Sequence, residues 1–199
     1  MNNIETTLRR AAERLPSAPP ELSGRAETEG LVDVAYTSVD SPLGPLLVAA
    51  SPKGLVRVSY SDPRGPDHVI EELAERISPR VLEAPARLDP VRRELDEYFA
   101  GRRTEFETAI DWSHLAGFTR KVLRATAGIG FGETSTYAGV ASRAGSPRAM
   151  RAAGNALGAN PMPVIVPCHH VLRTGGVLGG YTGGIERKEF LLRLEGVLG

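Results

Sequence analysis

The chain has 199 residues, 41% of them hydrophobic and 24% charged, which is typical of a soluble globular protein with one large or two small domains. No apolar run reaches the roughly 18 residues that a membrane helix requires, and the N-terminus lacks a signal pattern, so a cytoplasmic protein is expected. The single cysteine excludes an internal disulfide, and His68 and His114 show no ligand spacing with it, so a four-ligand structural zinc is not expected. We expect no other metal site and no cofactor.

The formal net charge is zero, but the charges are unevenly distributed along the chain. Residues 1–112 hold 14 basic and 20 acidic residues, a net of −6, whereas residues 113–199 hold 10 and 4, a net of +6. This asymmetry indicates that the C-terminal half binds a polyanion. The alternative is that the uneven distribution of charge arose by chance.

The N-terminal half begins with a polar, proline-containing segment, residues 1–30, which we interpret as a poorly ordered leader. Short apolar segments at 31–37, 46–50 and 55–60 are separated by turn sequences and predict a small antiparallel sheet. Periodic apolar positions predict helices over 67–77 and 89–99, and alternation over 104–110 predicts another strand. A domain over 31–112 therefore precedes a boundary near 112–118.

The C-terminal half, residues 113–199, is predicted to be mostly helical. A helix over 119–127 begins at a Thr119 cap, and a glycine-rich break separates it from a helix over 136–144. Gly145 ends that helix, Ser146 caps the next one, and Pro147 takes its first position. Two helices joined by a tight glycine turn have the form of a helix-turn-helix.

The second helix of this pair, over 147–157, has two distinct faces. Met150, Ala153 and Leu157 are spaced to face the core. The outer face carries Arg148, Arg151, Ala152 and Asn155. Small side chains would let the helix approach a nucleic-acid groove closely, with a long arginine entering the groove or the base stack. The alternative is an alanine-rich surface helix with solvated arginines.

The only cysteine, Cys168, follows the proline-rich run 160–167 and is followed directly by His169 and His170. A lone thiol beside an imidazole is typical of a sulfur nucleophile, although a solitary cysteine in an apolar run is also common in a core. Glu195 ends a predicted helix over 185–194, where the helix dipole opposes its charge, so it is either functional or a frayed surface residue.

Several short motifs surround this cysteine. Pro167-Cys168-His169 is preceded by Asn160-Pro161 and followed by the glycine-rich segment 179–184, Arg187-Lys188, Leu191-Leu192 and Glu195-Gly196. With segments 41–44 and 97–101, they resemble the O6-alkylguanine-DNA alkyltransferases, the methylated-DNA–protein-cysteine methyltransferases, most densely over 118–196. The resemblance implies an α+β fold, with a ribonuclease H-like N-terminal sheet domain and a winged-helix-like, mostly helical C-terminal domain.

The resemblance also implies roles for site residues. Cys168 would accept the alkyl group irreversibly from O6 of a flipped guanine, with His169 as general base through a water and Glu195 orienting the imidazole. Tyr137 would hydrogen-bond the guanine and help to protonate N3, and Asn160 would fix the turn before the active-site segment. A base and a carboxylate are needed because a free thiol is only a few per cent thiolate at neutral pH.

Further residues are implied in binding. The alkylguanine pocket would be lined by Pro163, Val171, Tyr181 and Thr182. Arg151 would fill the gap left by the flipped nucleotide. Other DNA contacts would come from Arg148, Ala152, Asn155 and Thr136. One position departs from the family pattern, which has arginine after the histidine; here it is His170, which puts local ion pairing and the rate in doubt, and His170 could compete as the base.

The implied function is DNA repair by direct, single-turnover alkyl transfer from O6-alkylguanine in duplex DNA to Cys168, with O4-alkylthymine left open as a second substrate. We expect a monomer without an obligate protein partner or membrane contact. The main alternative is a non-catalytic protein that binds the lesion and flags it for another repair pathway. A cysteine hydrolase fits less well, because its histidine would be distant in sequence, and a helix-turn-helix regulator would call for a dimer.

Overall fold

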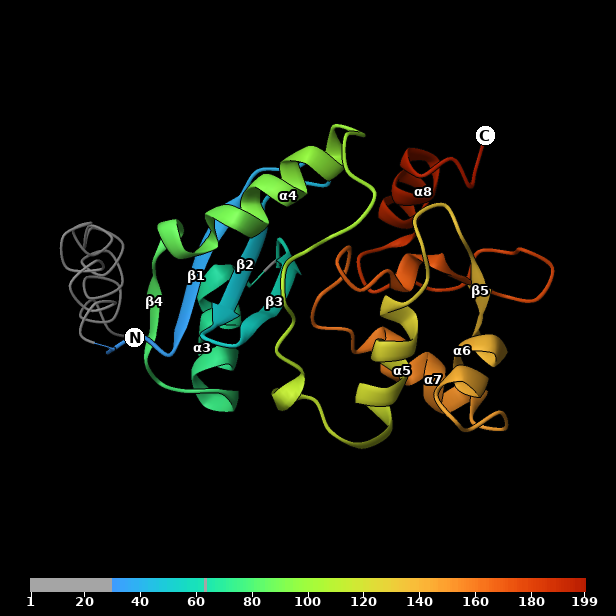
Figure 1. Ribbon diagram of the computed structural model, residues 1–199, viewed down its shortest axis with the longest axis horizontal. Coiled ribbons are helices and arrows are strands. Elements are labelled where there is room, and N and C mark those ends of the chain that lie inside the picture. Colours follow the sequence, from blue (N-terminus) through green and yellow to red (C-terminus); the bar gives the residue numbers. More distant parts are fainter. Residues whose placement is uncertain (1–29, 63) are drawn as a thin grey trace, which may run out of the picture.

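The computed structural model describes residues 30–62 and 64–199 and shows an N-terminal sheet packed beside a C-terminal helical part (Figure 1). The predicted leader, apart from Gly30, lies outside the described residues. Strands β1 (Val34–Val39), β2 (Leu46–Ser51), β3 (Gly54–Tyr60) and β4 (Val81–Glu83) form one sheet in the order β3-β2-β1-β4. The first three strands pair antiparallel, as predicted. The short β4, which was not predicted, adds parallel to β1.

Two helices cover opposite faces of this sheet (Figure 1). Helix α3 (Pro66–Arg76) packs Val69 and Leu73 against one face, and α4 (Asp89–Phe99), which follows the 3-10 turn η1 (Pro85–Leu88), packs Val91 and Leu95 against the other. The period-2 alternation of the strands supplies both apolar faces. Helix α4 has the predicted bounds, because its apolar stripe matches the 3.6-residue helical period.

The predicted strand over 104–110 is wrong. This segment is an extended strap with a single bridge between Leu55 and Ile110. The buried carboxylate of Glu94 accepts hydrogen bonds from the backbone N–H groups of Glu107 and Thr108, so those donors are not free to pair with a strand. At the sheet edge, a side chain on Gly54 would collide with the Ala109 carbonyl, so this close approach requires glycine.

The C-terminal part begins at the 3-10 turn η2 (Trp112–His114) and is mostly helical. It contains α5 (Gly117–Ala127), β5 (Ser135–Thr136), α6 (Tyr137–Arg143), α7 (Met150–Gly158), η3 (Cys168–His170), β6 (Val171–Leu172) and α8 (Ile185–Leu194). Helices α6 and α7 form the predicted helix-turn-helix, and β5 pairs parallel with β6. The core is continuous with that of the sheet, since one cluster of buried residues spans both parts.

Three predicted details of these helices are wrong. Helix α5 starts at Gly117 after an Ala116 N-cap, so Thr119 lies inside the helix. Helix α7 starts at Met150, because residues 146–149 close a separate turn through the Ala149 N–H and the Ser146 carbonyl. Met150 is therefore at the first position of the helix and is half exposed instead of core-facing.

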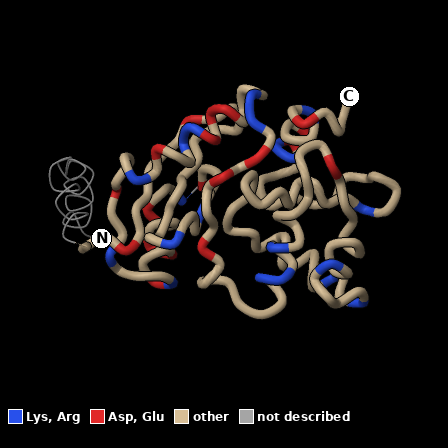
Figure 2. Tube along the Cα trace, in the orientation of Figure 1, with Lys and Arg blue, Asp and Glu red and all other residues tan. Residues whose placement is uncertain are grey.

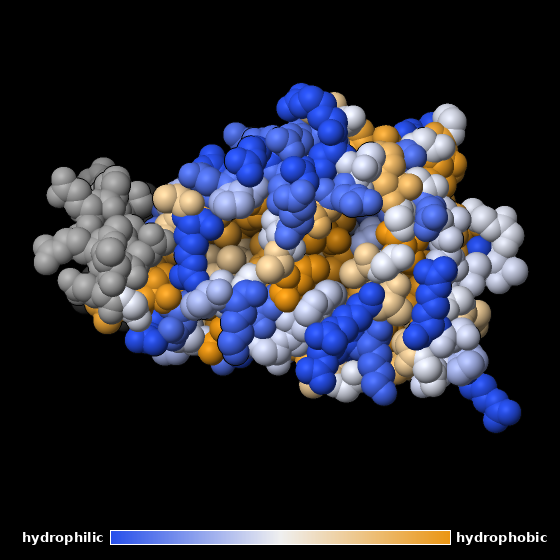
Figure 3. Space-filling model, in the orientation of Figure 1, coloured by the Kyte–Doolittle hydropathy of each residue, from blue (hydrophilic) through white to orange (hydrophobic). Residues whose placement is uncertain are grey.

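The surface reflects the division of charge found in the sequence. In Figure 2 the acidic positions lie mainly on the N-terminal part, and most marked positions on the C-terminal part are basic. Figure 3 shows apolar surface in a hollowed band between the two parts, bordered by hydrophilic side chains. None of the helices in the described part of the chain is long and apolar enough to cross a membrane.

Candidate active site

Cys168 lies in the 3-10 turn η3 at the end of a buried segment. Asn160 determines the path of this segment: its side-chain nitrogen donates to the Val166 carbonyl at 2.9 Å and to Cys168 Sγ at 3.1 Å, while its oxygen accepts from the Met162 N–H at 3.0 Å. Val164 is the only non-glycine residue with a positive φ, 74°, among residues 30–62 and 64–199. The amide thus holds a strained turn and the sulfur together.

The Cys168 side chain is 6% exposed. Burial raises the pKa of its thiol, and the Asn160 hydrogen bond and the Lys188 charge oppose this only in part. The resting side chain is therefore a neutral thiol. The adjacent His169 does not by itself produce a large thiolate fraction. For this sulfur to act as a nucleophile, the thiol proton would have to be removed as the sulfur attacks.

Cys168 opens into a cavity of about 360 Å³, large enough for a purine and a small substituent. The cavity is lined by Tyr137, Gly154, Leu157, Gly158, Cys168, Gly180, Tyr181 and Thr182. Tyr137, Tyr181 and Thr182 thus meet at the cysteine. Pro163 and Val171, expected in the lining, are instead buried in the core and do not line this cavity.

The glycine-rich loop closes one side of this cavity. Thr182 Oγ1 donates to the Gly158 carbonyl at 2.7 Å and attaches the loop to the end of α7. A side chain on Gly179 would overlap the Tyr137 ring, so glycine is needed there for the loop to approach the phenol. From the N-terminal part, the Tyr60 hydroxyl lies 2.6 Å from the Tyr181 hydroxyl.

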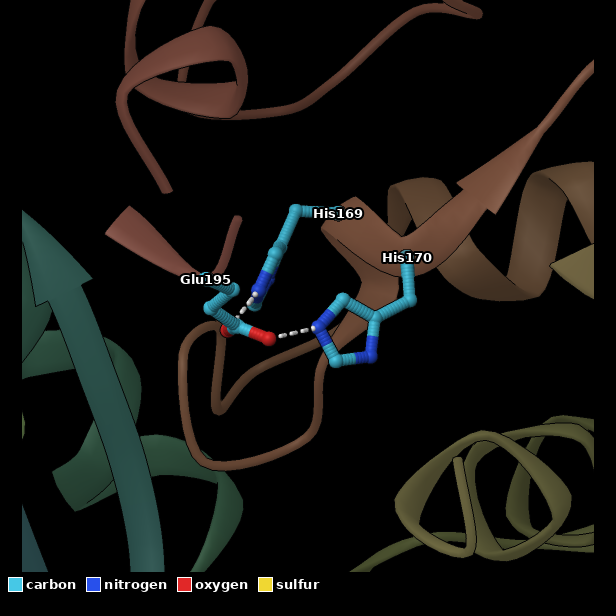
Figure 4. Close-up of side chains that lie close together, drawn as sticks. All are labelled: His169, His170 and Glu195. Carbon is cyan, nitrogen blue, oxygen red and sulfur yellow. Dashed lines mark hydrogen bonds and ion pairs between the residues drawn. The ribbon is translucent and has the colours of Figure 1, made fainter. Parts of the chain in front are cut away.

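The two histidines that follow Cys168 form a buried cluster with Glu195 (Figure 4). His169 Nε2 is 2.8 Å from Glu195 Oε1, and His170 Nε2 is 2.6 Å from Oε2. The Tyr98 hydroxyl donates to Oε1 at 2.6 Å, and the Gly132 N–H donates to Oε2 at 2.9 Å. Each carboxylate oxygen therefore has two hydrogen-bonding partners.

These contacts determine the protonation of the cluster. Burial raises the pKa of Glu195, but the hydrogen bonds from His169 and His170 outweigh it, and the net pKa is lowered. A carboxylate only accepts hydrogen bonds, so both Nε2 atoms carry the donated proton. The Nδ1 atoms of both histidines are buried and have no partner within the described chain.

His169 is suited to accept a proton. Burial lowers its pKa to about 4, and the hydrogen bond to Glu195 opposes this shift only in part. The ring is therefore neutral near pH 7, with its free lone pair on Nδ1. Glu195 can stabilise the imidazolium that forms on proton transfer, as the carboxylate does in other nucleophile, histidine and acid arrangements.

Lys188 is a further buried group that the sequence analysis did not assign to the site. Its side chain is fully buried, its amine donates to the Val171 carbonyl at 2.6 Å, and burial lowers its pKa to about 8. The sequence feature that could have indicated Lys188 is its spacing: it lies seven residues before Glu195, which places both on the same face of α8.

The ligand atoms of His169, His170 and Glu195 lie within 4.8 Å of one another, close enough for a metal ion. However, all four donors around Glu195 already form hydrogen bonds with its two carboxylate oxygens. A metal would have to displace protons from both Nε2 atoms, so the donor set fits a hydrogen-bonded cluster better than a metal centre.

Four of the five expected DNA-binding residues are exposed, and Thr136 is half-buried. Arg151, Ala152 and Asn155 are exposed on α7, and Arg148 is exposed in the turn before it. Thr136 accepts a hydrogen bond from the Gly139 N–H and caps α6. The opposite face of α7 contributes Gly154 and Leu157 to the cavity, so one helix connects its exposed face to the cysteine.

Fold and site together define a two-part protein in which a thiol, imidazole and carboxylate site lies beneath a helix-turn-helix. Two family models match the chain: "6-O-methylguanine DNA methyltransferase, ribonuclease-like domain" over residues 34–112 and "6-O-methylguanine DNA methyltransferase, DNA binding domain" over residues 117–197. The chain belongs to the 6-O-methylguanine DNA methyltransferase family.

Individual relatives agree with this assignment. The chain is 37% identical over 164 residues to the methylated-DNA–protein-cysteine methyltransferase of Mycobacterium tuberculosis, covering 81% of this chain and 92% of the relative. It is 34% identical over 163 residues to the constitutive enzyme of that name from Bacillus subtilis, covering 80% and 94%. The crystal structure of Mycobacterium tuberculosis OGT in complex with DNA aligns with a TM-score of 0.68 at 37% identity, covering 81% and 92%.

Proposed function

We propose that this protein repairs DNA by transferring the alkyl group of O6-alkylguanine to Cys168 in a single, irreversible turnover. The observation that carries the proposal is the position of the Cys168 thiol, which lines a purine-sized cavity while Asn160 holds the sulfur from behind. The enzymes of the family that this chain matches bear the name methylated-DNA–protein-cysteine methyltransferase. We assign the transfer to the part of the chain over 113–199.

In the proposed reaction, Cys168 Sγ attacks the alkyl carbon attached to O6. The S–C bond forms, the C–O bond breaks, and the C–O electron pair remains with the purine. The thiol proton passes to His169 Nδ1 through a bridging water, and Glu195 stabilises the resulting imidazolium. The lone pair on Nδ1 and its lack of another partner support this route.

The departing purine needs a proton where negative charge develops. Tyr137 lines the cavity, and its hydroxyl makes one long contact, 3.5 Å to the Gly180 carbonyl, so it is available to donate to N3. The phenolate then regains a proton through solvent, and the His169 imidazolium releases the proton that came from the thiol, so the purine gains the proton that the thiol has lost. Burial raises the pKa of Tyr137, so the phenol is protonated at working pH. We propose His169 and not His170 as the base, because the His169 ring lies 6.5 Å from the ring of Tyr181, which lines this cavity, whereas His170 lines a separate cavity.

A damaged base inside a duplex cannot reach a buried thiol, so the nucleotide must be flipped out, at a cost of a few kcal/mol. We propose that Arg151 fills the vacated position and that Arg148, Ala152, Asn155 and Thr136 contact the DNA. The exposure of α7 on the basic part of the protein supports this docking. The partner is then duplex DNA carrying the lesion, bound by a monomer.

A labelled methyl group tests the proposal. Duplex DNA with methyl-labelled O6-methylguanine is incubated with the protein, and label is followed in protein and DNA. We expect stoichiometric transfer to protein and no second turnover. Label that stays on the DNA while binding persists would instead support a lesion-binding protein that flags the damage for another pathway.

A further inference from the structure

The carboxylate of the site has a partner from outside the C-terminal part of the chain. Tyr98 lies in the last turn of α4, and its hydroxyl reaches Glu195 Oε1 at 2.6 Å across 97 residues of sequence. Oε1 is the same oxygen that His169 uses. We propose that Tyr98 is a positioning residue for alkyl transfer: its hydroxyl keeps the Glu195 carboxylate oriented toward His169. This inference rests on the function proposed above.

The ring of Tyr98 is held in place on several sides. It is 2% exposed and lies against Phe99, Phe106 and Phe131, with ring centroids 5.3, 5.2 and 6.2 Å away. Within the described chain, the hydroxyl has no hydrogen-bond partner other than Glu195. Burial and the charge of Glu195 both raise the pKa of Tyr98, so this hydroxyl is a fixed donor at every working pH.

A fixed donor to Oε1 is important because the Glu195 carboxylate can stabilise the His169 imidazolium only while it is oriented toward that ring. The remaining groups that face Glu195 are His169 and His170 from η3 and the Gly132 N–H from the loop before β5, and Lys188 of α8 acts on His169 through its charge. Without the phenol, Oε1 keeps only His169 as its partner. The carboxylate can then rotate or take up a proton more readily, and it stabilises the His169 imidazolium less well.

Water can replace part of this contact. Tyr98, His170 and Glu195 line a second cavity of about 400 Å³ between the sheet and the helical part. A water entering from there can donate to Oε1, so removal of the hydroxyl slows transfer and does not abolish it. We expect Tyr98→Phe to reduce the rate at neutral pH by about tenfold, as for a hydrogen bond to a charged group.

The test is a single-turnover rate measured from pH 5 to 9 on the full chain with O6-methylguanine duplex. Tyr98→Phe should lower the rate over this whole range, because His169 and Glu195 titrate below it, with lesion binding unchanged. Tyr36→Phe is the matched control, since Tyr36 is a half-buried tyrosine on β1, where the nearby acids are Glu83 and Asp67. A Tyr98→Phe profile that overlays that of Tyr36→Phe would overturn the proposal.

Two further measurements separate a positioning role from simple loss of packing. In a Glu195→Gln background, Tyr98→Phe should have little additional effect on rate, whereas additive losses would mean that Tyr98 acts independently of Glu195. Should Tyr98→Phe not fold, the NMR signal of the slowly exchanging Tyr98 hydroxyl proton in the otherwise native chain replaces it. Glu195→Gln should shift that signal, and an unshifted signal would contradict the contact. Absence of transfer by the native protein would instead refute the proposed function alone.

Discussion

The N-terminal and C-terminal parts of the molecule use their residues differently. In the N-terminal part, regular strands and two amphipathic helices bury alternating apolar side chains, and the helix α4 delivers Tyr98 to the site. In the C-terminal part, the reactive groups stand on irregular backbone, with Cys168 and both histidines in a three-residue 3-10 turn. The sheet domain therefore serves as a scaffold, while the proposed chemistry depends on a turn held by side chains such as Asn160.

The largest effect is expected at the sulfur itself. Cys168→Ala should abolish alkyl transfer and keep lesion binding, because alanine preserves the turn and removes only the nucleophile. A matched change in the scaffold, such as Leu95→Val in α4, should leave transfer intact. Gel-shift affinity and label transfer on the same duplex measure both effects, and residual transfer by Cys168→Ala would place the acceptor elsewhere.

Asn160→Ala tests whether the irregular turn depends on one amide. The substitution removes three hydrogen bonds and leaves the Met162 N–H without its partner, while the Val166 carbonyl still accepts from the Cys168 N–H at 2.7 Å. We expect about 2–4 kcal/mol of lost unfolding free energy and a strongly reduced transfer rate. Denaturant unfolding and transfer kinetics measure this, and wild-type stability would show that the turn holds without the amide.

Lowering the pH should reduce the free energy of unfolding through the buried cluster of His169 and Glu195. The folded-state pKa of His169 is about 4 against an ordinary 6.5, so between these values the folded protein binds fewer protons than the unfolded chain. Its contribution is present above pH 6.5 and is lost as pH falls toward 4, a loss of up to about 3 kcal/mol. The lowered pKa of Glu195 adds a loss in the same direction below its ordinary 4.5.

Denaturant unfolding from pH 7 to 4 checks this prediction. His169→Gln should flatten the dependence between pH 6.5 and 4, because glutamine does not titrate. An unchanged slope in that variant would show that the acid loss arises outside the cluster.

The smallest and most selective effect is expected on the outer face of α7. Arg151→Ala should weaken action on duplex DNA by about tenfold while reaction with free O6-benzylguanine stays near wild type, because the free base needs no flipping. Arg143→Ala, at the exposed end of α6, is the control of equal charge. Equal losses on both substrates would contradict the role of Arg151.

The regular parts of the fold could be predicted because burying one face of a helix or strand requires apolar residues at regular intervals along the sequence. Helices α4 and α8 have the predicted bounds, and the three antiparallel strands lie where alternating apolar segments predicted them. The strap over 104–110 could not be predicted, because the Glu94 side chain determines where its backbone donors go. Long-range contacts of this kind leave no periodic signal.

The same distinction applies to the site. Cys168, His169, Tyr137 and Glu195 were predicted from short motifs and the resemblance to a family. In the structure Tyr137 and Cys168 line one cavity, and His169 is hydrogen-bonded to Glu195. The contact between Tyr98 and Glu195 was not foreseen, because Tyr98 fits the apolar stripe of α4 as an ordinary core residue. Only the fold shows that the polar end of this core residue reaches the carboxylate.

The central claim is that the thiol of Cys168 accepts the alkyl group. The most direct test is mass spectrometry of proteolytic peptides after reaction with duplex DNA containing O6-methylguanine. The account predicts one added methyl group per protein, on the peptide containing Cys168 and on its sulfur. An unmodified Cys168 peptide, or a methyl group on any other residue, would contradict it.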